Sequence, residues 1–233
     1  MNPNEHGKRV SSLFDNIATW YDFLNHFLSL GQDIYWRYRL VRTLRTGSTG
    51  AVLDLAAGTL DVSREILRRH PALKVLSLDF SRAMLCSGKK KIAHQPSIFP
   101  VQADGRALPL PDACVDTVTI AFGIRNILPR TEAYSEILRV LAPGGRLCIL
   151  EFGTGQARIW QGAYNFYLGK VLPRIGRFFS KNPEAYQYLA DTILAFPHAS
   201  DLAKELRDAG FDKIGYQALS SGIVYIHVAQ KPS

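Results

Sequence analysis

The sequence predicts a doubly wound α/β fold, in which a mostly parallel seven-stranded sheet carries helices on both faces and ends in an antiparallel hairpin. Short, almost continuously apolar runs are typical of strands buried on both faces; they lie at 51–55, 74–79, 116–122 and 146–152, with a further strand at 98–103. Segments with helical spacing separate these runs, and such alternation favours a parallel sheet. Only a short turn at 220–222 joins the last two runs, 213–219 and 222–230, so these strands should pair antiparallel.

The helical segments indicate that residues 1–233 form one domain with two additions. Residues 8–45 have the spacing of two or three helices with a stop at Gly31, and we expect residues 1–46 to form a helical lid. Residues 153–200 interrupt the sheet pattern and are interpreted as a helical insertion before the last helix at 200–210. Ser81 and Thr131 are the predicted N-caps of the helices after the second and fourth strands.

The composition is that of a folded globular protein. Of its 233 residues, 47% are hydrophobic and 21% charged, which excludes a disordered tail, a collagen-like repeat and a coiled coil. Three scattered cysteines without a CxxC pair exclude a disulfide framework and a zinc knuckle and suggest a reducing compartment. We find no apolar run of ~18 residues, so we expect no signal peptide or membrane span and a cytoplasmic location.

The formal net charge of +8 leaves three kinds of partner open: nucleic acid, an anionic membrane surface, or solvent alone. Most of the positive charge occurs in twos and threes, which is typical of solvated helix faces. The stretch 158–181 differs because its basic residues alternate with aromatic ones and no acid intervenes. It predicts either a membrane-interface element or a packed lid or dimer surface.

The loop after the first strand, Asp54 to Asp61, carries the first functional signal. It has a single glycine, Gly58, so it is neither a GxGxxG dinucleotide fingerprint nor a P-loop. Asp61, at the start of the next helix, would repel a phosphate but tolerates a cation. A nucleoside cofactor with a positive sulfonium fits this loop, so we predict S-adenosylmethionine, with Asp54 and Gly58 as cofactor-binding residues.

Two further acids follow the next two strands. Asp79 ends the second strand, where a carboxylate can accept hydrogen bonds from both ribose hydroxyls. Asp104 follows the third strand, where its carboxylate or a neighbouring backbone group can receive the adenine amine. Each acid alone could be a helix cap or a loop residue. Together with the acids of the Asp54–Asp61 loop they lie at the ends of three successive strands, which favours one nucleoside site.

The order of AVLDLAAGT (51–59), Asp79, ADGRALPLPDACVD (103–116) and RVLAPGGRLCILEF (139–152) resembles class I S-adenosylmethionine-dependent methyltransferases, which have a Rossmann-like fold. Four more segments resemble the quinone-biosynthesis C-methyltransferases within that class: YDFLNHFLSLGQDIYWR (21–37), FGIRNI (122–127), YQYLADTILAFP (186–197) and SGIVYIHVAQK (221–231). The resemblance implies C-methylation of a polyprenylated hydroquinone, with demethylmenaquinol the favoured substrate, peripheral contact at the inner face of the membrane, and a homodimer as one option. It places Thr59, Asp79, Asp104, Gly105 and Ala121 at cofactor-contacting positions.

The sequence departs from the family pattern in the cofactor loop. Glycines are usual where this chain has Ala57 and Leu60, and a serine is usual at Ala121. If the loop still binds the cofactor, we expect Leu60 to keep a negative φ and to pack toward the first helix or the lid instead of the sulfonium. One alternative is a catalytically silent relative. A second is a methyltransferase that acts on another small aromatic substrate or on nucleic acid. The nucleic-acid version is weakened because the sequence has no appended RNA-binding module and no continuous basic stripe.

The implied chemistry needs alignment, a dry site and a stabilised phenolate, because the aromatic carbon becomes nucleophilic only when the adjacent hydroxyl loses its proton. Arg125 follows the fourth strand, where its guanidinium could hold the phenolate or a water that accepts the proton. A structural ion pair is the alternative for Arg125. Asn126 beside it and Tyr21 on the lid are the predicted substrate-binding residues.

Overall fold

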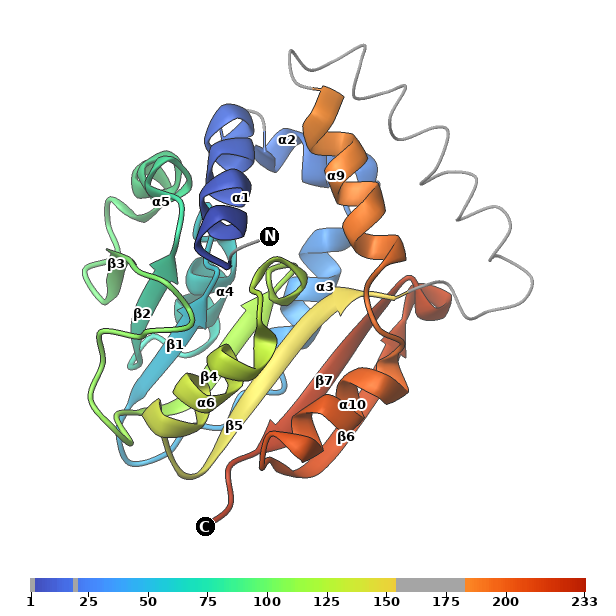
Figure 1. The fold of residues 1–233 in the computed structure, drawn as a ribbon. Coiled ribbons are helices and arrows are strands. Elements are labelled where there is room, and N and C mark those ends of the chain that lie inside the picture. Colours follow the sequence, from blue (N-terminus) through green and yellow to red (C-terminus); the bar gives the residue numbers. More distant parts are fainter. Residues whose placement is uncertain (1–2, 19–20, 154–182) are drawn as a thin grey trace.

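The computed structural model describes residues 3–18, 21–153 and 183–233. Seven strands form one sheet in the order β3-β2-β1-β4-β5-β7-β6 (Figure 1). The strands are β1 (Ala51–Leu55), β2 (Lys74–Asp79), β3 (Ile98–Gln102), β4 (Val115–Ala121), β5 (Leu141–Phe152), β6 (Asp212–Leu219) and β7 (Val224–Gln230). The first five strands are parallel, and β7 pairs antiparallel with both β5 and β6. This confirms the predicted fold class.

Helices cover both faces of the sheet, as Figure 1 shows. They are α1 (Pro3–Ile17), α2 (Tyr21–Leu28), α3 (Gln32–Val41), α4 (Asp61–Arg69), α5 (Arg82–Lys89), α6 (Arg130–Val140), α9 (Pro183–Leu194) and α10 (Ala199–Asp208), with single 3₁₀ turns η1 (Lys90–Ile92), η2 (Ile124–Asn126) and η4 (Ser220–Gly222). Helices α6 and α10 pack on one face, and α3 and α4 pack on the other.

Alternation along the strands builds the two cores. In β1, Val52 joins the core beneath α3 and α4, whereas Leu53 and Leu55 join the core beneath α6 and α10. All three are buried. Successive side chains of a strand point to opposite faces, so a central strand covered on both sides has an apolar residue at nearly every position. This arrangement accounts for the continuous apolar runs in the sequence.

Several predicted element ends differ from the structure by one or two residues, and two predictions are wrong outright. The fifth strand begins at Leu141 rather than 146, because the segment 141–145, whose Pro-Gly-Gly is typical of a helix stop, extends the strand instead, with Val115 opposite Leu141 and an irregular register before Thr117. Thr131 is not an N-cap, since α6 begins one residue earlier and Pro129 occupies the cap position. Ser81 is an N-cap as predicted, and its hydroxyl accepts a hydrogen bond from the Met84 amide at 3.1 Å.

The lid and the insertion meet above the carboxyl ends of the strands. Helix α1 packs against α5 and against α9, which belongs to the predicted insertion 153–200. The basic, aromatic stretch 158–181 lies outside the described residues. No helix among residues 3–18, 21–153 and 183–233 is long and apolar enough to cross a membrane.

Candidate active site

A cavity opens at the carboxyl ends of β1, β2 and β4, where the strand order reverses and α/β sheets bind their ligands. Its floor comes from the loops after these strands and after β3, and its roof from α1 and Tyr21 of α2. The predicted site residues on its wall are Tyr21, Gly58, Asp79, Asp104, Gly105, Ala121 and Asn126. The remaining wall is largely apolar and includes Val10, Phe14, Leu55, Phe80, Met84 and Ile127.

Asp79 is the most deeply buried acid of this wall. Its Oδ2 accepts a hydrogen bond from the Gly58 amide and its Oδ1 one from the Ser81 amide, each at 2.8 Å. Burial raises the pKa of the Asp79 carboxyl, and these amide bonds oppose that rise. Because a carboxylate accepts about four hydrogen bonds, Asp79 retains capacity for two hydroxyls of a ligand.

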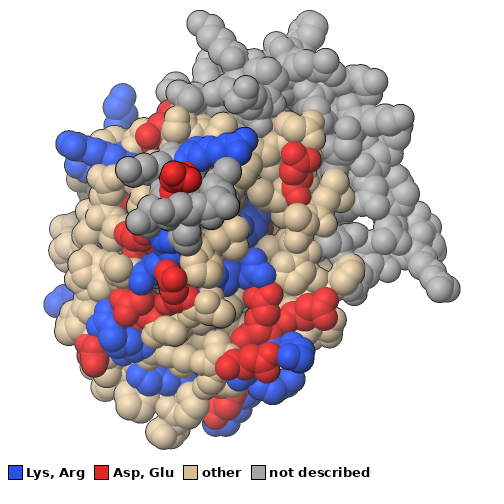
Figure 2. Space-filling view, viewed as in Figure 1, with Lys and Arg blue, Asp and Glu red and all other residues tan. Residues whose placement is uncertain are grey.

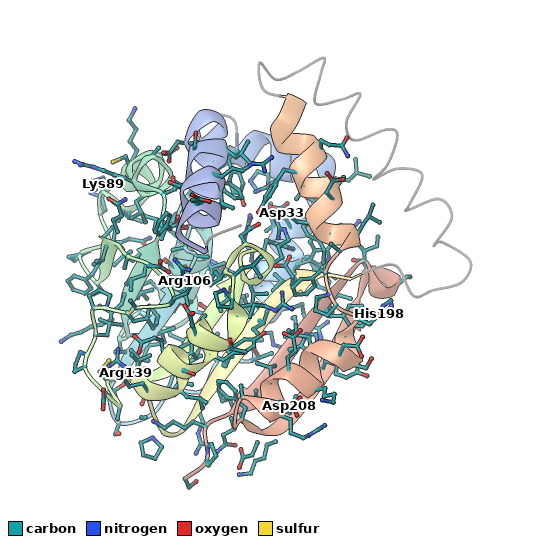
Figure 3. The ribbon with its side chains drawn as sticks, viewed as in Figure 1. Asp33, Lys89, Arg106, Arg139, His198 and Asp208 are labelled. Atoms are coloured by element: carbon teal, nitrogen blue, oxygen red, sulfur yellow. The ribbon has the colours of Figure 1, made fainter. Side chains whose placement is uncertain are left out.

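Asp104 and Gly105 line the cavity just after β3, the strand that pairs with β2 beside Asp79. The side chain of Arg106, which Figure 3 labels, pairs with Asp104, with Nη2 2.7 Å from Oδ2 and Nε 3.1 Å from Oδ1. These bonds, set against partial burial, lower the pKa of the Asp104 carboxyl. At Gly105 a β-carbon would lie 3.2 Å from Ile127 Cδ1. The Asp104 carboxylate is thus largely engaged by Arg106, and Gly105 keeps the neighbouring backbone open to the cavity.

The loop between β1 and α4 has a left-handed backbone at three positions, with φ of 55° at Ala56, 53° at Gly58 and 68° at Leu60. The expectation of a negative φ at Leu60 is therefore wrong. Leu60 is fully buried, packs with Ala57 and Leu85 of α5, and is absent from the cavity wall. Its side chain thus points away from the cavity, as expected, but toward α5 instead of the lid or α4.

Two predicted cofactor-binding residues lie behind the wall. Asp54 accepts hydrogen bonds from the hydroxyls of Ser63 at 2.6 Å and Thr119 at 3.0 Å, and burial raises its pKa to about 6. Thr59 donates its hydroxyl to Asp22 of α2. In this structure Asp54 and Thr59 support the loop and join it to the lid, and neither lines the cavity.

Asp22 connects the lid to the cofactor loop. Its sequence position predicts a place on the lid, and the structure adds the contacts that it makes there. Its Oδ2 lies 2.5 Å from Lys91 Nζ, which also lies 2.8 Å from Asp61 Oδ1. Partial burial would raise the pKa of the Asp22 carboxyl, but the bonds from Lys91 and Thr59 outweigh it and lower that pKa. The roof of the cavity is therefore held to its floor by charged hydrogen bonds.

At the end of β4 the chain passes very close to the cofactor loop. A β-carbon on Gly123 would lie only 2.4 Å from the β-carbon of Ala56. Only glycine therefore fits at 123 while the two loops keep this separation. Ala121, just before, lines the cavity, and Phe122 has a φ of 58°.

Arg125, the predicted catalytic residue, forms a buried ion pair. Its Nη1 donates to Glu151 Oε1 and to the Phe122 carbonyl, each at 2.6 Å. The side chain does not line the cavity, but its charge reaches Tyr21, which does. The ion pair that was the alternative for Arg125 is present, and it leaves other donors of the guanidinium unused.

The predicted substrate-binding residues lie on the same side of the cavity. Asn126 Oδ1 accepts a hydrogen bond from the Tyr188 hydroxyl of α9 at 3.0 Å. Burial raises the pKa of Tyr21, although the Asn25 side chain and the Arg125 charge partly oppose it. Tyr188 was missed because only the tertiary approach of α9 brings it to η2.

Known proteins with similar sequences show the family of this chain. The model of the ubiE/COQ5 methyltransferase family matches residues 2–231. The chain belongs to this family. It is 42% identical to the ubiquinone/menaquinone biosynthesis C-methyltransferase UbiE of Geobacter sulfurreducens, over 97% of this chain and 90% of that protein. It is 43% identical to the demethylmenaquinone methyltransferase of Mycobacterium marinum, over 96% of this chain and 94% of that protein.

Solved structures place the ubiE/COQ5 family member among methyltransferase folds. An S-adenosylmethionine-dependent methyltransferase from Thermotoga maritima superposes with a TM-score of 0.67 at 15% identity, covering 94% of this chain and 98% of that one. Phosphoethanolamine N-methyltransferase 2 of Haemonchus contortus, solved with S-adenosyl-L-methionine, superposes with a TM-score of 0.64 at 15% identity, covering 91% of this chain and 60% of that one. These structures show the class I methyltransferase fold, and the family match shows that the protein is a methyltransferase.

Proposed function

We propose that this ubiE/COQ5 family member transfers a methyl group from S-adenosylmethionine to a ring carbon of a polyprenylated hydroquinone, with demethylmenaquinol as substrate. The observation that carries the proposal is one cavity lined both by Asp79, a carboxylate with room for further hydrogen bonds, and by Tyr21 and Asn126, with the Arg125 charge acting on Tyr21. The activities named for the Geobacter and Mycobacterium relatives support the same reaction.

The residues on the wall suit the cofactor. Asp79 offers a carboxylate for the ribose hydroxyls, and the Asp104–Gly105 backbone offers polar groups for the adenine edge. Apolar side chains such as Met84 and Phe80 give the purine faces to pack against. When bound, S-adenosylmethionine supplies an electrophilic methyl group on a sulfonium, which tolerates a loop whose helix begins with Asp61.

The protein's part in the reaction is to orient, to exclude water and to stabilise charge. The quinol carbon attacks once the neighbouring oxygen carries negative charge, and a guanidinium in a dry site stabilises that charge far more than water would. We assign this role to Arg125. The roof formed by α1 and Tyr21 excludes bulk water from the cavity.

Tyr21 and Asn126 are proposed to hold the quinol ring. Asn126 is oriented by Tyr188, so its amide presents a defined donor to the cavity. Tyr21 gives an aromatic surface and a hydroxyl on the roof. An aromatic ring between them would lie on the Arg125 side of the cavity.

A polyprenyl tail would keep the substrate in a bilayer, so we propose a cytoplasmic enzyme that contacts the inner face of the membrane. At the α2–α3 corner Leu30 is 86% exposed, and Ile34 and Tyr35 are exposed beside it. Arg39 on α3 and Arg42 at the C-cap of this helix suit anionic lipid head groups. Sedimentation with vesicles should rise with anionic lipid and fall with salt, and Leu30→Ser with Ile34→Ser should weaken it.

Nucleic acid is the less favoured partner. Figure 2 shows Lys and Arg interspersed with Asp and Glu on the face it displays, without a continuous basic stripe among the described residues there. A phosphate-binding surface would be expected to collect positive charge along one path.

A homodimer is compatible with the proposal, and analytical ultracentrifugation would establish its presence.

The function is tested with the methyl-labelled cofactor. The protein is incubated with a panel of demethylated naphthoquinols and benzoquinols, and the lipid products are analysed by mass spectrometry. We expect label in the naphthoquinol. Label in benzoquinol alone would change the substrate, label in added RNA alone would replace the proposal, and cofactor binding without transfer would indicate another small substrate. No cofactor binding by calorimetry would favour a silent relative.

A further inference from the structure

The Arg125 guanidinium has an unused edge. Nη1 is engaged by Glu151 and by the Phe122 carbonyl, and neither of these acceptors reaches Nη2. Nε is buried and has no hydrogen-bond partner in the described part of the chain. Nε and Nη2 form the side-on fork of a guanidinium, whose parallel N–H bonds match an anionic oxygen group. A buried donor without an acceptor costs about 1–3 kcal/mol, so this edge is available to an acceptor that the described residues do not supply.

Glu151 determines which edge remains unused. It lies near the end of β5, 1% exposed, and β5 runs parallel to β4 with Leu150 opposite Ala121. Its Oε1 accepts from Arg125 Nη1 at 2.6 Å and from the Phe152 amide at 3.0 Å. Its Oε2 lies 3.4 Å from the Arg125 amide nitrogen. One carboxylate therefore holds both the backbone and the side chain of Arg125.

We propose that Glu151 is a positioning residue for methyl transfer. By engaging Nη1, it fixes the guanidinium behind the cavity wall with Nε and Nη2 unengaged, so that its positive charge acts on the substrate oxygen on which negative charge develops. The inference rests on the proposed function, because it needs a substrate hydroxyl that ionises. A role in stability alone explains the pair poorly, since apolar residues of similar volume often replace a buried ion pair without loss of stability.

The charges around Arg125 give the proposal a specific signature. Burial raises the pKa values of Tyr21 of α2 and Tyr188 of α9, and the positive charge of Arg125 lowers both. The charge of Arg9 also lowers the pKa of Tyr188. The charge of Arg37 lowers the pKa of Tyr21, whereas that of Asp79 raises it. Glu151 contributes the directly paired negative charge. Its neutralisation would leave the guanidinium uncompensated and would lower the pH at which the substrate hydroxyl ionises.

Two substitutions separate position from charge. Glu151→Asp keeps the charge and shortens the side chain by one methylene, and Glu151→Gln keeps the length and removes the charge. The matched control is Glu205→Gln, which breaks the Arg130–Glu205 pair of 2.6 Å between α6 and α10, outside the cavity wall. Calorimetric titration with S-adenosylhomocysteine gives the fraction of each protein that binds the cofactor product. The kcat and KM for the quinol are then measured across pH, with kcat expressed per binding-competent site.

We expect Glu151→Asp to lower kcat by about tenfold or more with the S-adenosylhomocysteine Kd within about twofold of the parent's. Glu151→Gln should also lower kcat and move the rise of kcat to lower pH, whereas Glu205→Gln should leave kcat per site unchanged. If Glu151→Gln does not fold, the Glu151→Asp criterion stands alone. Unchanged kcat in either Glu151 variant, or a fall in kcat of Glu151→Gln with an unmoved pH profile, would overturn the proposal. A parent that methylates no quinol defeats the proposed function and this inference together.

Discussion

Leu60 and Gly88 are in such close contact that a β-carbon on Gly88 would lie 2.7 Å from Leu60 Cγ. The same atom would lie 2.7 Å from the Thr59 carbonyl oxygen. Leu60 is fully buried in a left-handed conformation, φ 68°, where glycine is the ordinary residue. The glycine that accommodates this loop is therefore on the neighbouring helix, α5, at the position that faces the leucine.

Gly88→Ala should lower the free energy of unfolding by about 1–3 kcal/mol, because the new methyl group meets backbone as well as a side chain. At an exposed position in a helix, the same change would leave the free energy of unfolding unchanged or raise it by up to about 1 kcal/mol. Gly7→Ala in α1 is the matched control, since its β-carbon would lie 3.6 Å from the Phe80 ring. Urea denaturation measures both, and equal stabilisation by the two changes would show that the loop moves freely away from α5.

Leu60→Gly should destabilise the protein by about 1–4 kcal/mol. Relief of the left-handed backbone gains roughly 1–2 kcal/mol, but removal of a buried leucine side chain costs about 2–5 kcal/mol. The affinity for S-adenosylhomocysteine should change less than about threefold, because Leu60 does not line the cavity. Calorimetry that found at least tenfold tighter binding would mean that Leu60 blocks the site in solution.

Asp54→Asn should remove a pH-dependent part of stability. The Asp54 carboxyl ionises near pKa 3.8 when unfolded and near 6 when buried, so between these values the folded state holds a proton that the unfolded state has lost. Its contribution is favourable below the lower pKa and is lost as pH rises to the upper one, by about 3 kcal/mol at most. The free energy of unfolding is measured for parent and variant from acid to neutral pH. As pH rises, that of the parent should fall relative to that of the variant. A constant difference would contradict the raised pKa.

Asp79→Ala should weaken S-adenosylhomocysteine binding by about 1.5–3 kcal/mol, since a charged acceptor is lost. The Gly58 and Ser81 amides that it now binds would also need water in its place. Asp112→Ala, at an exposed carboxylate paired with Arg139, is the control and should leave binding unchanged. Calorimetry together with thermal unfolding distinguishes loss of the contact from loss of the fold, and unchanged affinity would remove Asp79 from the cofactor site.

The sequence predicted what depends on local pattern. Strands 51–55 and 74–79 agree to the residue with β1 and β2, because burial on both faces makes their runs apolar from end to end. Asp79 could be found because it ends one of them. The early start of β5 could not, since pairing with β4 extends that strand through a segment with the signals of a helix stop.

The contacts that were not predicted join residues far apart in the chain. Glu151 sits inside an apolar strand run, and only the adjacency of β4 and β5 brings it to Arg125. Asp22 meets Thr59 and Lys91 because the lid folds over the cofactor loop. Leu60 adopts its conformation because Gly88 gives it space. Spacing along the sequence contains no signal for any of these.

The order of the last strands has a consequence for how the protein is made. β7 follows β6 in the chain but inserts between β5 and β6, and it is the partner of β5 from Arg146 to Phe152. While a ribosome is still synthesising the chain, the β5 edge is open and β6 has no neighbour, and such edges invite pairing with other chains. The parallel half can assemble earlier, but the sheet closes only after the residues of β7 emerge, so nascent chains depend most on chaperone protection in that interval.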